Sequence, residues 1–382
     1  MSFYEACQWP KYGEEELEAI TRVLSSNQLF AQNEVRNFEG EFAHYVGASD
    51  AAGVMNATAG LHLVLAALGI GKGDEVIVTS YSWVSTASSI LMQNAIPIFC
   101  DIESESFGID PIDLAQKITH RTKAVVITHV FGYPAKIDEI IKIAQDANIY
   151  LIEDASHAHG SYLFGKHLGT FGDAGVFSLH QRKNLSVGDG GMVIMKDLEI
   201  LRKIKRLRSF GDTELSYNYR MTEFAAAIGR VRLKRLDKEN QQRRELVGLI
   251  SKLLEGNKNV LVRKPSEGSV CSYHALLLEV LCEIKVENLD KLLEKLQSEG
   301  MPIRKTWEPL HKHPHFNSNF APPRGFPWME DSYEGVMKTE KYSHLDLPVV
   351  NHYCPNRLLE LYVHPTIPEK TYLNINSQLS FT

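Results

Sequence analysis

The chain has 382 residues, of which 44% are hydrophobic and 23% charged. This length exceeds what one hydrophobic core usually serves, so we expect a large domain and a smaller one. The formal net charge of -6 gives no basic field to attract a phosphate backbone, so nucleic acid is not expected as a partner. The five cysteines are scattered and form no C-x-x-C pair, which disfavours a disulfide framework and a cysteine-based zinc site and favours a reducing cytoplasm.

The N-terminal segment MSFYEACQWPKYGEEE lacks the charged-then-apolar layout of a signal peptide, and no apolar run reaches membrane-spanning length. We therefore expect a cytoplasmic protein without a membrane segment. Residues 13 to 26 place Leu17, Ile20, Val23 and Leu24 on one helical stripe, with acidic residues in the first turn, which predicts a surface helix.

Short β-branched runs then alternate with helical stretches. Strands are predicted at residues 75 to 79, 97 to 100, 123 to 127, 149 to 153, 174 to 178 and 192 to 195, and helices near residues 58 to 68, 83 to 94, 110 to 118 and 136 to 147. This alternation predicts an α/β fold with a mostly parallel sheet and helices on both faces. Ligands bind outside the carboxyl ends of the strands in such sheets, so the residues that follow each strand are candidates for a site.

The pattern changes after a long charged helical stretch at residues 230 to 254. Short strand-like runs and the helix NLDKLLEKLQSEG follow, which predicts a small α+β domain. We expect a large domain at residues 1 to 250 and a small C-terminal domain at residues 251 to 382. Residues 313 to 328 are rich in Pro, Gly and Asn and predict a loop.

Asp154 closes the buried run IYLIED, where a solvated surface acid would not normally lie. A buried carboxylate requires a cationic partner or hydrogen bonds. One interpretation is a structural acid that caps the next helix. The other is a carboxylate that pairs with a protonated ring nitrogen.

Lys183 follows the strand-like run GVFS and precedes the glycine-rich run GDGG. A lysine at such a place is often a solvated surface residue. The glycines allow backbone to approach a ligand closely, and Ser178 offers a hydroxyl to phosphate oxygens. An amine in a partly dry pocket has a lowered pKa and attacks carbonyl carbons to form a Schiff base.

Two earlier segments offer further binding groups. Ala57, Thr58 and Ala59 begin an apolar helix, whose free N–H groups and positive dipole end suit an anion, although an ordinary capped helix has the same pattern. Trp83 follows the strand EVIVT, where its indole can stack on a planar cofactor, although an isolated aromatic residue is more often part of a core.

From Leu17 onward, the chain resembles the sugar aminotransferases of the DegT/StrS type, which are pyridoxal 5'-phosphate (PLP) enzymes of fold type I. The matching stretches are FEGEFAHYVGA, NATAGLHLVLAALGIGKGDEVIV, TSYSWVSTASSIL, TKAVVITHVFGYPAKIDEI, LIEDASHAHGS, FSLHQRKNLSVGDGGMV and YNYRMTEFAAAIGRVRL. The succession of these motifs along the chain is long and specific.

The resemblance implies roles for the residues that match the family motifs. Lys183 matches the lysine that forms the Schiff base and moves the proton, and Asp154 matches the carboxylate that keeps the pyridine nitrogen protonated. Trp83 matches the aromatic residue that stacks on the ring.

The phosphate-binding residues are implied in the same way. Thr58, the Ala59 N–H and Ser178 match the phosphate cradle. Asn218, in YNYRMTE, matches an asparagine that reaches the phosphate bound by the neighbouring subunit. The resemblance therefore implies a homodimer with shared active sites.

The sequence departs from the family pattern at several places. Ala57 stands where the family usually has Gly, and Asp189 replaces the more frequent Glu. His157 stands where many members have a Gln near the 3'-oxygen of the cofactor, and a histidine ordinarily titrates near neutral pH. The segment LDLPVVNHYCPNRLLELYVHPTIPEK differs most, so substrate contacts from the C-terminal domain are not transferred.

Two other patterns are weaker. The run GIGKG at residues 69 to 73 follows a helix and precedes a strand, the reverse of a dinucleotide fingerprint, and predicts a connecting turn. His311, His313 and His315 alternate, but Pro314 and the lack of a suitably spaced carboxylate favour loop histidines over a metal site. His311 lies in a P-L-H stretch that is close to the substrate in the family, and it is a candidate for substrate contact.

These observations predict a PLP-dependent aminotransferase that transfers an amino group from glutamate or glutamine to a keto-sugar, with a nucleotide-linked sugar favoured. A free keto-cyclitol or a sugar phosphate is an alternative acceptor. A PLP sugar dehydratase is an alternative enzyme, although related dehydratases have His where this chain has Lys183. A PLP-binding regulatory protein is the alternative outside enzymes.

Overall fold

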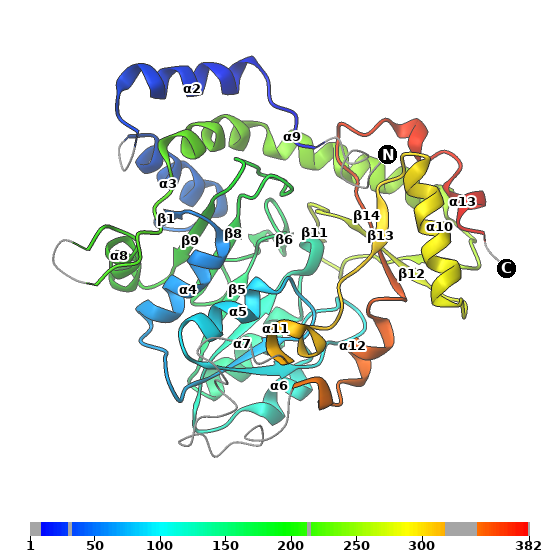
Figure 1. The fold of residues 1–382 in the computed structure, drawn as a ribbon, viewed down its shortest axis with the longest axis horizontal. Helices are drawn as coiled ribbons and strands as arrows, with labels where there is room; N and C mark the ends of the chain where they lie inside the picture. The colour runs from blue at the N-terminus through cyan, green and yellow to red at the C-terminus, as the bar shows by residue number, and fades with distance from the viewer. Residues whose placement is uncertain (1–8, 30–32, 212–214, 318–341, 381–382) are drawn as a thin grey trace.

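The computed structural model describes residues 9–29, 33–211, 215–317 and 342–380. Its centre is a seven-stranded sheet with the strand order β1-β9-β8-β5-β4-β2-β3 (Figure 1). These strands are β1 (Ala51–Val54), β2 (Glu75–Thr79), β3 (Ile96–Cys100), β4 (Thr122–Thr128), β5 (Tyr150–Asp154), β8 (Ala174–Ser178) and β9 (Gly191–Met195). Strands β3, β2, β4, β5 and β8 run parallel, whereas β9 is antiparallel to both of its neighbours. The predicted mostly parallel sheet is therefore confirmed.

Helices cover both faces of this sheet because its strands are apolar on both faces. Along β2, Val76 and Val78 pack into one core and Ile77 into the other. The first face carries α4 (Ala57–Ala67), α5 (Ser85–Met92) and α8 (Leu198–Leu207). The second face carries α3 (Asn33–Val46), α6 (Pro111–Lys117), α7 (Ile137–Asp146) and the first part of α9 (Glu223–Leu253). Helix α2 (Glu14–Ser26) lies along α9.

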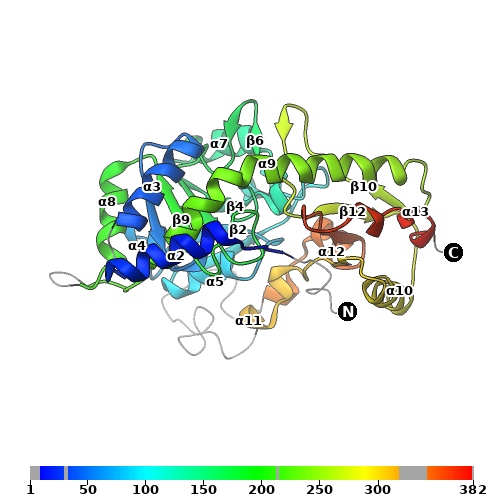
Figure 2. The same cartoon turned by 90° about the horizontal axis from the view of Figure 1, so that it is seen from above.

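A second sheet lies in the C-terminal part of the chain, with the strand order β10-β12-β14-β13. Its strands are β10 (Val260–Val262), β12 (Leu276–Val280), β13 (Ile303–Lys305) and β14 (Leu358–Leu361), and they are accompanied by α10 (Val286–Ser298), α11 (Pro314–Asn317), α12 (Pro348–Tyr353) and α13 (Ile375–Gln378). We call this part the small domain. The long helix α9 runs from the large domain along the small one (Figure 2), so the division predicted at residue 250 falls in its last turn.

The remaining elements are short. They are β6 (Tyr162–Leu163), β7 (Lys166–His167) and β11 (Ser269–Val270), which form a three-stranded sheet, and the 3-10 turns η1 (Val130–Gly132), η2 (Leu310–Lys312), η3 (Tyr342–His344) and η4 (Glu369–Thr371). Within the described ranges, none of the helices combines the length and apolar character that crossing a membrane requires.

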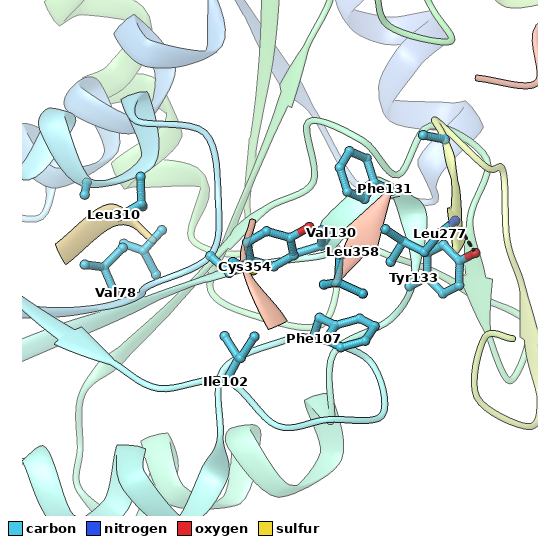
Figure 3. Close-up of a cluster of buried hydrophobic side chains, with 14 of the residues drawn as sticks. Val78, Ile102, Phe107, Val130, Phe131, Tyr133, Leu277, Leu310, Cys354 and Leu358 are labelled. Carbon is cyan, nitrogen blue, oxygen red and sulfur yellow. Dashed lines mark hydrogen bonds between the residues drawn. The ribbon is translucent and has the colours of Figure 1, made fainter. Parts of the chain in front are cut away.

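The two domains share one hydrophobic core. Figure 3 shows Val78, Phe131 and Tyr133 of the large domain packed with Leu277, Leu310 and Leu358 of the C-terminal part. The Leu277 N–H donates to the Tyr133 hydroxyl at 3.3 Å. Asp101 accepts hydrogen bonds from the N–H groups at the start of α12, at 2.8 and 2.9 Å. The small domain is thereby held against the ends of the large-domain strands.

Candidate active site

A cavity of about 300 Å³ lies where the parallel strands end. Thr128, Asp154 and Ser178 are the last residues of β4, β5 and β8, and each borders it. This is the edge at which open α/β sheets bind ligands. The small domain closes the cavity with His274, Arg304, Trp307 and Tyr362.

Asp154 is buried and held by hydrogen bonds in which its carboxylate accepts. The Thr86 hydroxyl donates to Oδ2 at 2.7 Å, and the Ser156 N–H donates to Oδ1 at 3.1 Å. Ser82 lies 2.7 Å from the Thr86 hydroxyl and accepts from Thr128 at 3.0 Å. This network fixes the carboxylate on the cavity wall, in a position that suits a protonated ring nitrogen.

Lys183 lies in the loop between β8 and β9, and its side chain borders the cavity. The loop is closed by backbone hydrogen bonds, among them Lys183 N–H to the His180 carbonyl at 2.8 Å. Burial lowers the pKa of the Lys183 amine to about 8, and Asp154 and Glu360 oppose that shift. About a tenth of the amine is therefore unprotonated at pH 7, far more than for an ordinary lysine, and this fraction is able to attack a carbonyl carbon.

The first described residues support the backbone of Lys183. The Trp9 indole N–H donates to the Lys183 carbonyl at 2.9 Å. The same indole stacks on His364, with ring centroids 4.9 Å apart, and the Arg243 guanidinium lies 4.6 Å from its ring centroid. Trp9 thus connects the lysine loop to the small domain and to α9.

The N-terminus of α4 opens into the cavity. Asn56, Ala57 and Thr58 border it, and the dipole of this helix favours an anion there. A Cβ on Gly191 would lie 2.8 Å from the carbonyl carbon of Asn56, so only glycine allows β9 to begin this close to the helix. Ser178 adds a hydroxyl. Of the residues assigned to the phosphate of their own subunit, Ala59 does not border the cavity, and its N–H donates to the helix-capping Asn56 Oδ1 at 2.9 Å.

His157 is buried at the cavity wall, and its hydrogen bonding fixes its tautomer. The Phe131 N–H donates to Nδ1 at 3.2 Å, so the ring proton resides on Nε2. Burial, with the charge of Lys183, lowers the pKa of His157 well below its ordinary value. The expectation of titration near neutral pH is therefore wrong, since the buried ring stays neutral. It stacks on His274 with ring centroids 4.3 Å apart.

Trp83 and Trp307 form an aromatic wall of the cavity. Trp83 is 56% exposed and meets Trp307 edge to face, with ring centroids 6.4 Å apart. An exposed indole at a strand end is available to a planar ligand. Trp307, His274, Tyr362 and Arg304 were not found from the sequence. The one available signal was the short distance of Trp307 along the chain from the P-L-H stretch.

Two predicted residues lie away from the cavity. His311 is fully buried in η2, whose Leu310 N–H bonds to the Ser80 carbonyl at 2.8 Å, and it does not border the cavity. Asn218 is exposed, with a φ of 61°, and also lies outside it. Among the described residues, no group of histidine, cysteine and acidic side chains is arranged to hold a metal ion.

The residues at the cavity fit PLP. A nucleophilic amine, a buried carboxylate, an exposed indole and a helix N-terminus next to hydroxyl groups match the aldehyde, ring nitrogen, ring face and phosphate of that cofactor.

The comparisons with known proteins agree with this fit. Residues 10–354 match the DegT/DnrJ/EryC1/StrS aminotransferase family. GDP-perosamine synthase from Escherichia coli O157:H7 is 31% identical over 320 residues, which cover 81% of this chain and 86% of that protein.

Two solved structures are also similar. The aminotransferase TlmJ from Streptoalloteichus hindustanus matches with a TM-score of 0.85 and 27% identity, over 97% of this chain and 96% of TlmJ. DesI, solved in the presence of its TDP-sugar product, matches with a TM-score of 0.82 and 26% identity, over 98% of this chain and 91% of DesI. The chain belongs to the DegT/DnrJ/EryC1/StrS aminotransferase family and is a PLP-dependent sugar aminotransferase of fold type I.

Proposed function

We propose that the protein transfers an amino group from glutamate or glutamine to a nucleotide-linked keto-sugar in amino-sugar biosynthesis. The observation that carries this proposal is the pair formed by Lys183, whose pKa is lowered to about 8, and the hydrogen-bonded Asp154 in one cavity. The nucleotide-linked acceptor is supported by two relatives, GDP-perosamine synthase and the DesI structure with its TDP-sugar product.

Bound PLP supplies an aldehyde carbon to which amines attach and a ring that accepts electrons. Lys183 anchors it, takes the proton from the α-carbon of the donor in the first half of the cycle, and delivers a proton to the sugar carbon in the second. Asp154 keeps a proton on the ring nitrogen. His157 Nε2 would donate toward the 3'-oxygen, and Thr58 and Ser178 would bind the phosphate. Trp83 and Trp307 would cover the ring and limit the access of water to it.

The assembly and location form part of the proposal. Asn218 lies exposed and outside the cavity of its own subunit, which suits a residue that reaches the phosphate of a neighbouring subunit in a homodimer. A cytoplasmic location is consistent with free buried cysteines such as Cys100, Cys271 and Cys354.

Glutamate or glutamine added to the purified holoprotein should convert the bound cofactor to its pyridoxamine form. This conversion is measured as a loss of the cofactor's absorbance in the visible range. Addition of a nucleotide-linked keto-sugar should restore that absorbance. Lys183→Ala should reduce the conversion rate by at least about 10³-fold, because the proton-transfer group is lost. Lys196→Ala, which alters an exposed lysine that bonds to the Phe171 carbonyl, is the control.

Each alternative predicts a different result. A PLP-binding regulatory protein would show no conversion with either amino acid. An enzyme for free cyclitols or sugar phosphates would convert with the amino acids but recover its absorbance with those acceptors and not with nucleotide-linked sugars. A dehydratase would consume the sugar without returning an aminated product.

A further inference from the structure

Both backbone polar groups of Lys183 are hydrogen-bonded. Its N–H donates to the His180 carbonyl oxygen within the loop, and its carbonyl oxygen accepts from the Trp9 indole N–H at 2.9 Å. A second contact joins the same two segments, because the Tyr12 hydroxyl lies 3.0 Å from the Ser186 hydroxyl. The first described residues therefore lie along the loop that carries the lysine and bond to it at two places.

A buried arginine holds the Trp9 indole. The Arg243 guanidinium lies over the indole ring at 4.6 Å from its centroid, and Arg243 is 0% exposed. Its Nε and Nη2 atoms have no hydrogen-bond partner within the described residues, so the face of the indole is a principal partner of this charge. Because charged and hydrogen-bonded groups polarise one another at low dielectric, this cation makes the indole N–H a stronger donor.

The same arginine is connected to the residue that follows the lysine. Arg243 Nη1 donates to Asn240 Oδ1 at 2.9 Å, and the Asn184 side-chain amide donates to the same oxygen at 3.2 Å. The Asn184 amide also donates to the Ser272 carbonyl oxygen at 2.9 Å. Residues 183 and 184 are thus tied to one buried guanidinium, the first through the indole and the second through a pair of amides.

We propose that Trp9, backed by Arg243, is a positioning residue that fixes the backbone of Lys183 for proton transfer. The inference rests on the proposed function, in which the lysine amine takes a proton from one carbon and delivers a proton to another. Neither Trp9 nor Arg243 borders the cavity, so both act through the lysine and not on a substrate.

A fixed backbone matters because the amine of a lysine lies at the end of a flexible four-carbon stem. The stem must bend between two positions of the amine, so the point from which it starts has to stay in place. A displacement of about 1 Å at a reacting group costs roughly 10²-fold in rate. Loss of the indole donor frees the Lys183 carbonyl and should therefore slow the proton transfer more than it weakens the binding of the donor.

The first test compares Trp9→Phe with Tyr12→Phe in the half-reaction with glutamate, or with glutamine if it is the faster donor. Trp9→Phe keeps an aromatic ring beside Arg243 but loses the N–H donor, whereas Tyr12→Phe loses only the hydroxyl that contacts Ser186. Trp9→Phe should lower the maximal rate roughly tenfold and leave the half-saturating concentration within about twofold. Tyr12→Phe, the matched control, should change both by less than about twofold. An unchanged rate in Trp9→Phe, or equal losses in the two variants, would overturn the proposal.

An isotope effect distinguishes positioning from a general loss of structure. A donor deuterated at its α-carbon reacts more slowly only in the step that moves this proton. Trp9→Phe should show an isotope effect at least as large as that of the wild type, because the step that it slows is the proton transfer. A smaller isotope effect would mean that another step had been slowed, and this result would overturn the positioning role.

Arg243→Met tests the other end of the network and keeps the proposal testable if Trp9→Phe folds poorly. Methionine carries no charge and cannot donate to Asn240, so this variant should slow the same step by roughly threefold to tenfold. Arg244→Met is its control and should change the rate by less than about twofold, because Arg244 bonds to Gln241 on the same helix. The double variant with Trp9→Phe should be no slower than the slower single variant, since both act on one backbone. Losses that multiply would overturn the role of Arg243 behind Trp9.

Hydrogen exchange of the holoprotein separates this inference from the proposed function. Backbone amides exchange through local opening, so release of the Lys183 carbonyl should speed the exchange of residues 183 to 187 in Trp9→Phe by at least about fivefold. The amides of β4 serve as the internal reference, because a general loss of stability would speed their exchange as well. If the wild type converts no amino acid, the proposed function fails, and the inference stands or falls on this measurement: loop exchange equal to that of the wild type would overturn it.

Discussion

Lys183 is surrounded by charges of both signs, and burial decides the outcome. Asp154 and Glu360 favour the protonated amine, and Arg182 and Arg304 disfavour it. These contributions oppose one another, so loss of water around the amine remains the main cause of its lowered pKa. The amine is therefore ready for Schiff-base formation without a separate general base.

The apoprotein should bind PLP covalently at a rate that depends on this pKa. The rate should rise with pH as the amine loses its proton and level off above about pH 8, because only the unprotonated amine is nucleophilic. Arg182→Gln should move the curve to higher pH, since Arg182 lowers the pKa. Stopped-flow absorbance on mixing the apoprotein with PLP measures the curve, and a midpoint at the ordinary value of 10.5 would contradict the prediction.

The sequence indicated the residues that follow strands but not those brought in from the small domain. Asp154 and Lys183 were predicted because each follows a recognisable buried run. Trp307, His274 and Arg304 border the cavity only because the small domain docks on the large one, and no local pattern encodes that docking. His311 is a candidate from the sequence because its P-L-H stretch is close to the substrate in the family, and the backbone bond from Leu310 to Ser80 directs it into the core.

At the scale of elements, the start of α4 and the start of β9 lie in direct contact. The anion site depends on this contact, because the first turn of the helix faces the cavity only while β9 begins beside Asn56. Position 191 therefore requires glycine, which has no side chain.

Gly191→Ala should weaken PLP binding and destabilise the fold. The added Cβ would meet the backbone of Asn56 at 2.8 Å and of Ala57 at 2.9 Å, and backbone atoms cannot move aside alone. Overpacking of this kind costs about 1 to 3 kcal/mol. Gly40→Ala in α3 is the control, because nothing lies within 4 Å of its added Cβ, and it should stabilise by up to about 1 kcal/mol. Urea unfolding and PLP titration measure both; unchanged PLP affinity in Gly191→Ala would refute the role.

The parallel strands were predicted closely because most of their residues are buried and apolar, and each run alternates with a helical stretch along the chain. The runs at Glu75–Thr79 and Ala174–Ser178 agree with β2 and β8 to the residue. β1 was missed because AAGV carries little β-branched character and becomes a strand only by pairing with β9. β9 runs antiparallel to β8, and the loop of residues 179 to 190 that connects them ends in the glycine-rich run.

At the scale of the whole molecule, many histidines are buried in neutral form. Burial lowers the pKa of His159 to about 3 and that of His167 and His311 to about 4, and it lowers the pKa of His157, His274 and His364 well below the ordinary value. In the unfolded chain these groups titrate near 6.5. The unfolded state therefore binds more protons below that pH.

The free energy of unfolding should fall as the pH decreases from about 6.5 toward 4. Stability rises with pH wherever the unfolded state binds more protons, so the contribution of these histidines is complete above 6.5 and declines below it. Each loses about 1.4 kcal/mol by about pH 5.5. His364→Phe should retain the stack on Trp9 and show a shallower decline. Urea unfolding from pH 7.5 to 5 checks this, and a decline of equal slope in the variant would contradict it.

Trp9 bonds to the carbonyl of a residue 174 positions away and stacks on His364, which lies near the opposite end of the chain. On the ribosome, Trp9 is made long before either partner. The stack that holds this indole is therefore completed only after β14 and the residues beyond it have been synthesised, and contacts of such large sequence separation form slowly. The large-domain sheet, together with the loop that carries Lys183, can form before His364 stacks on the indole.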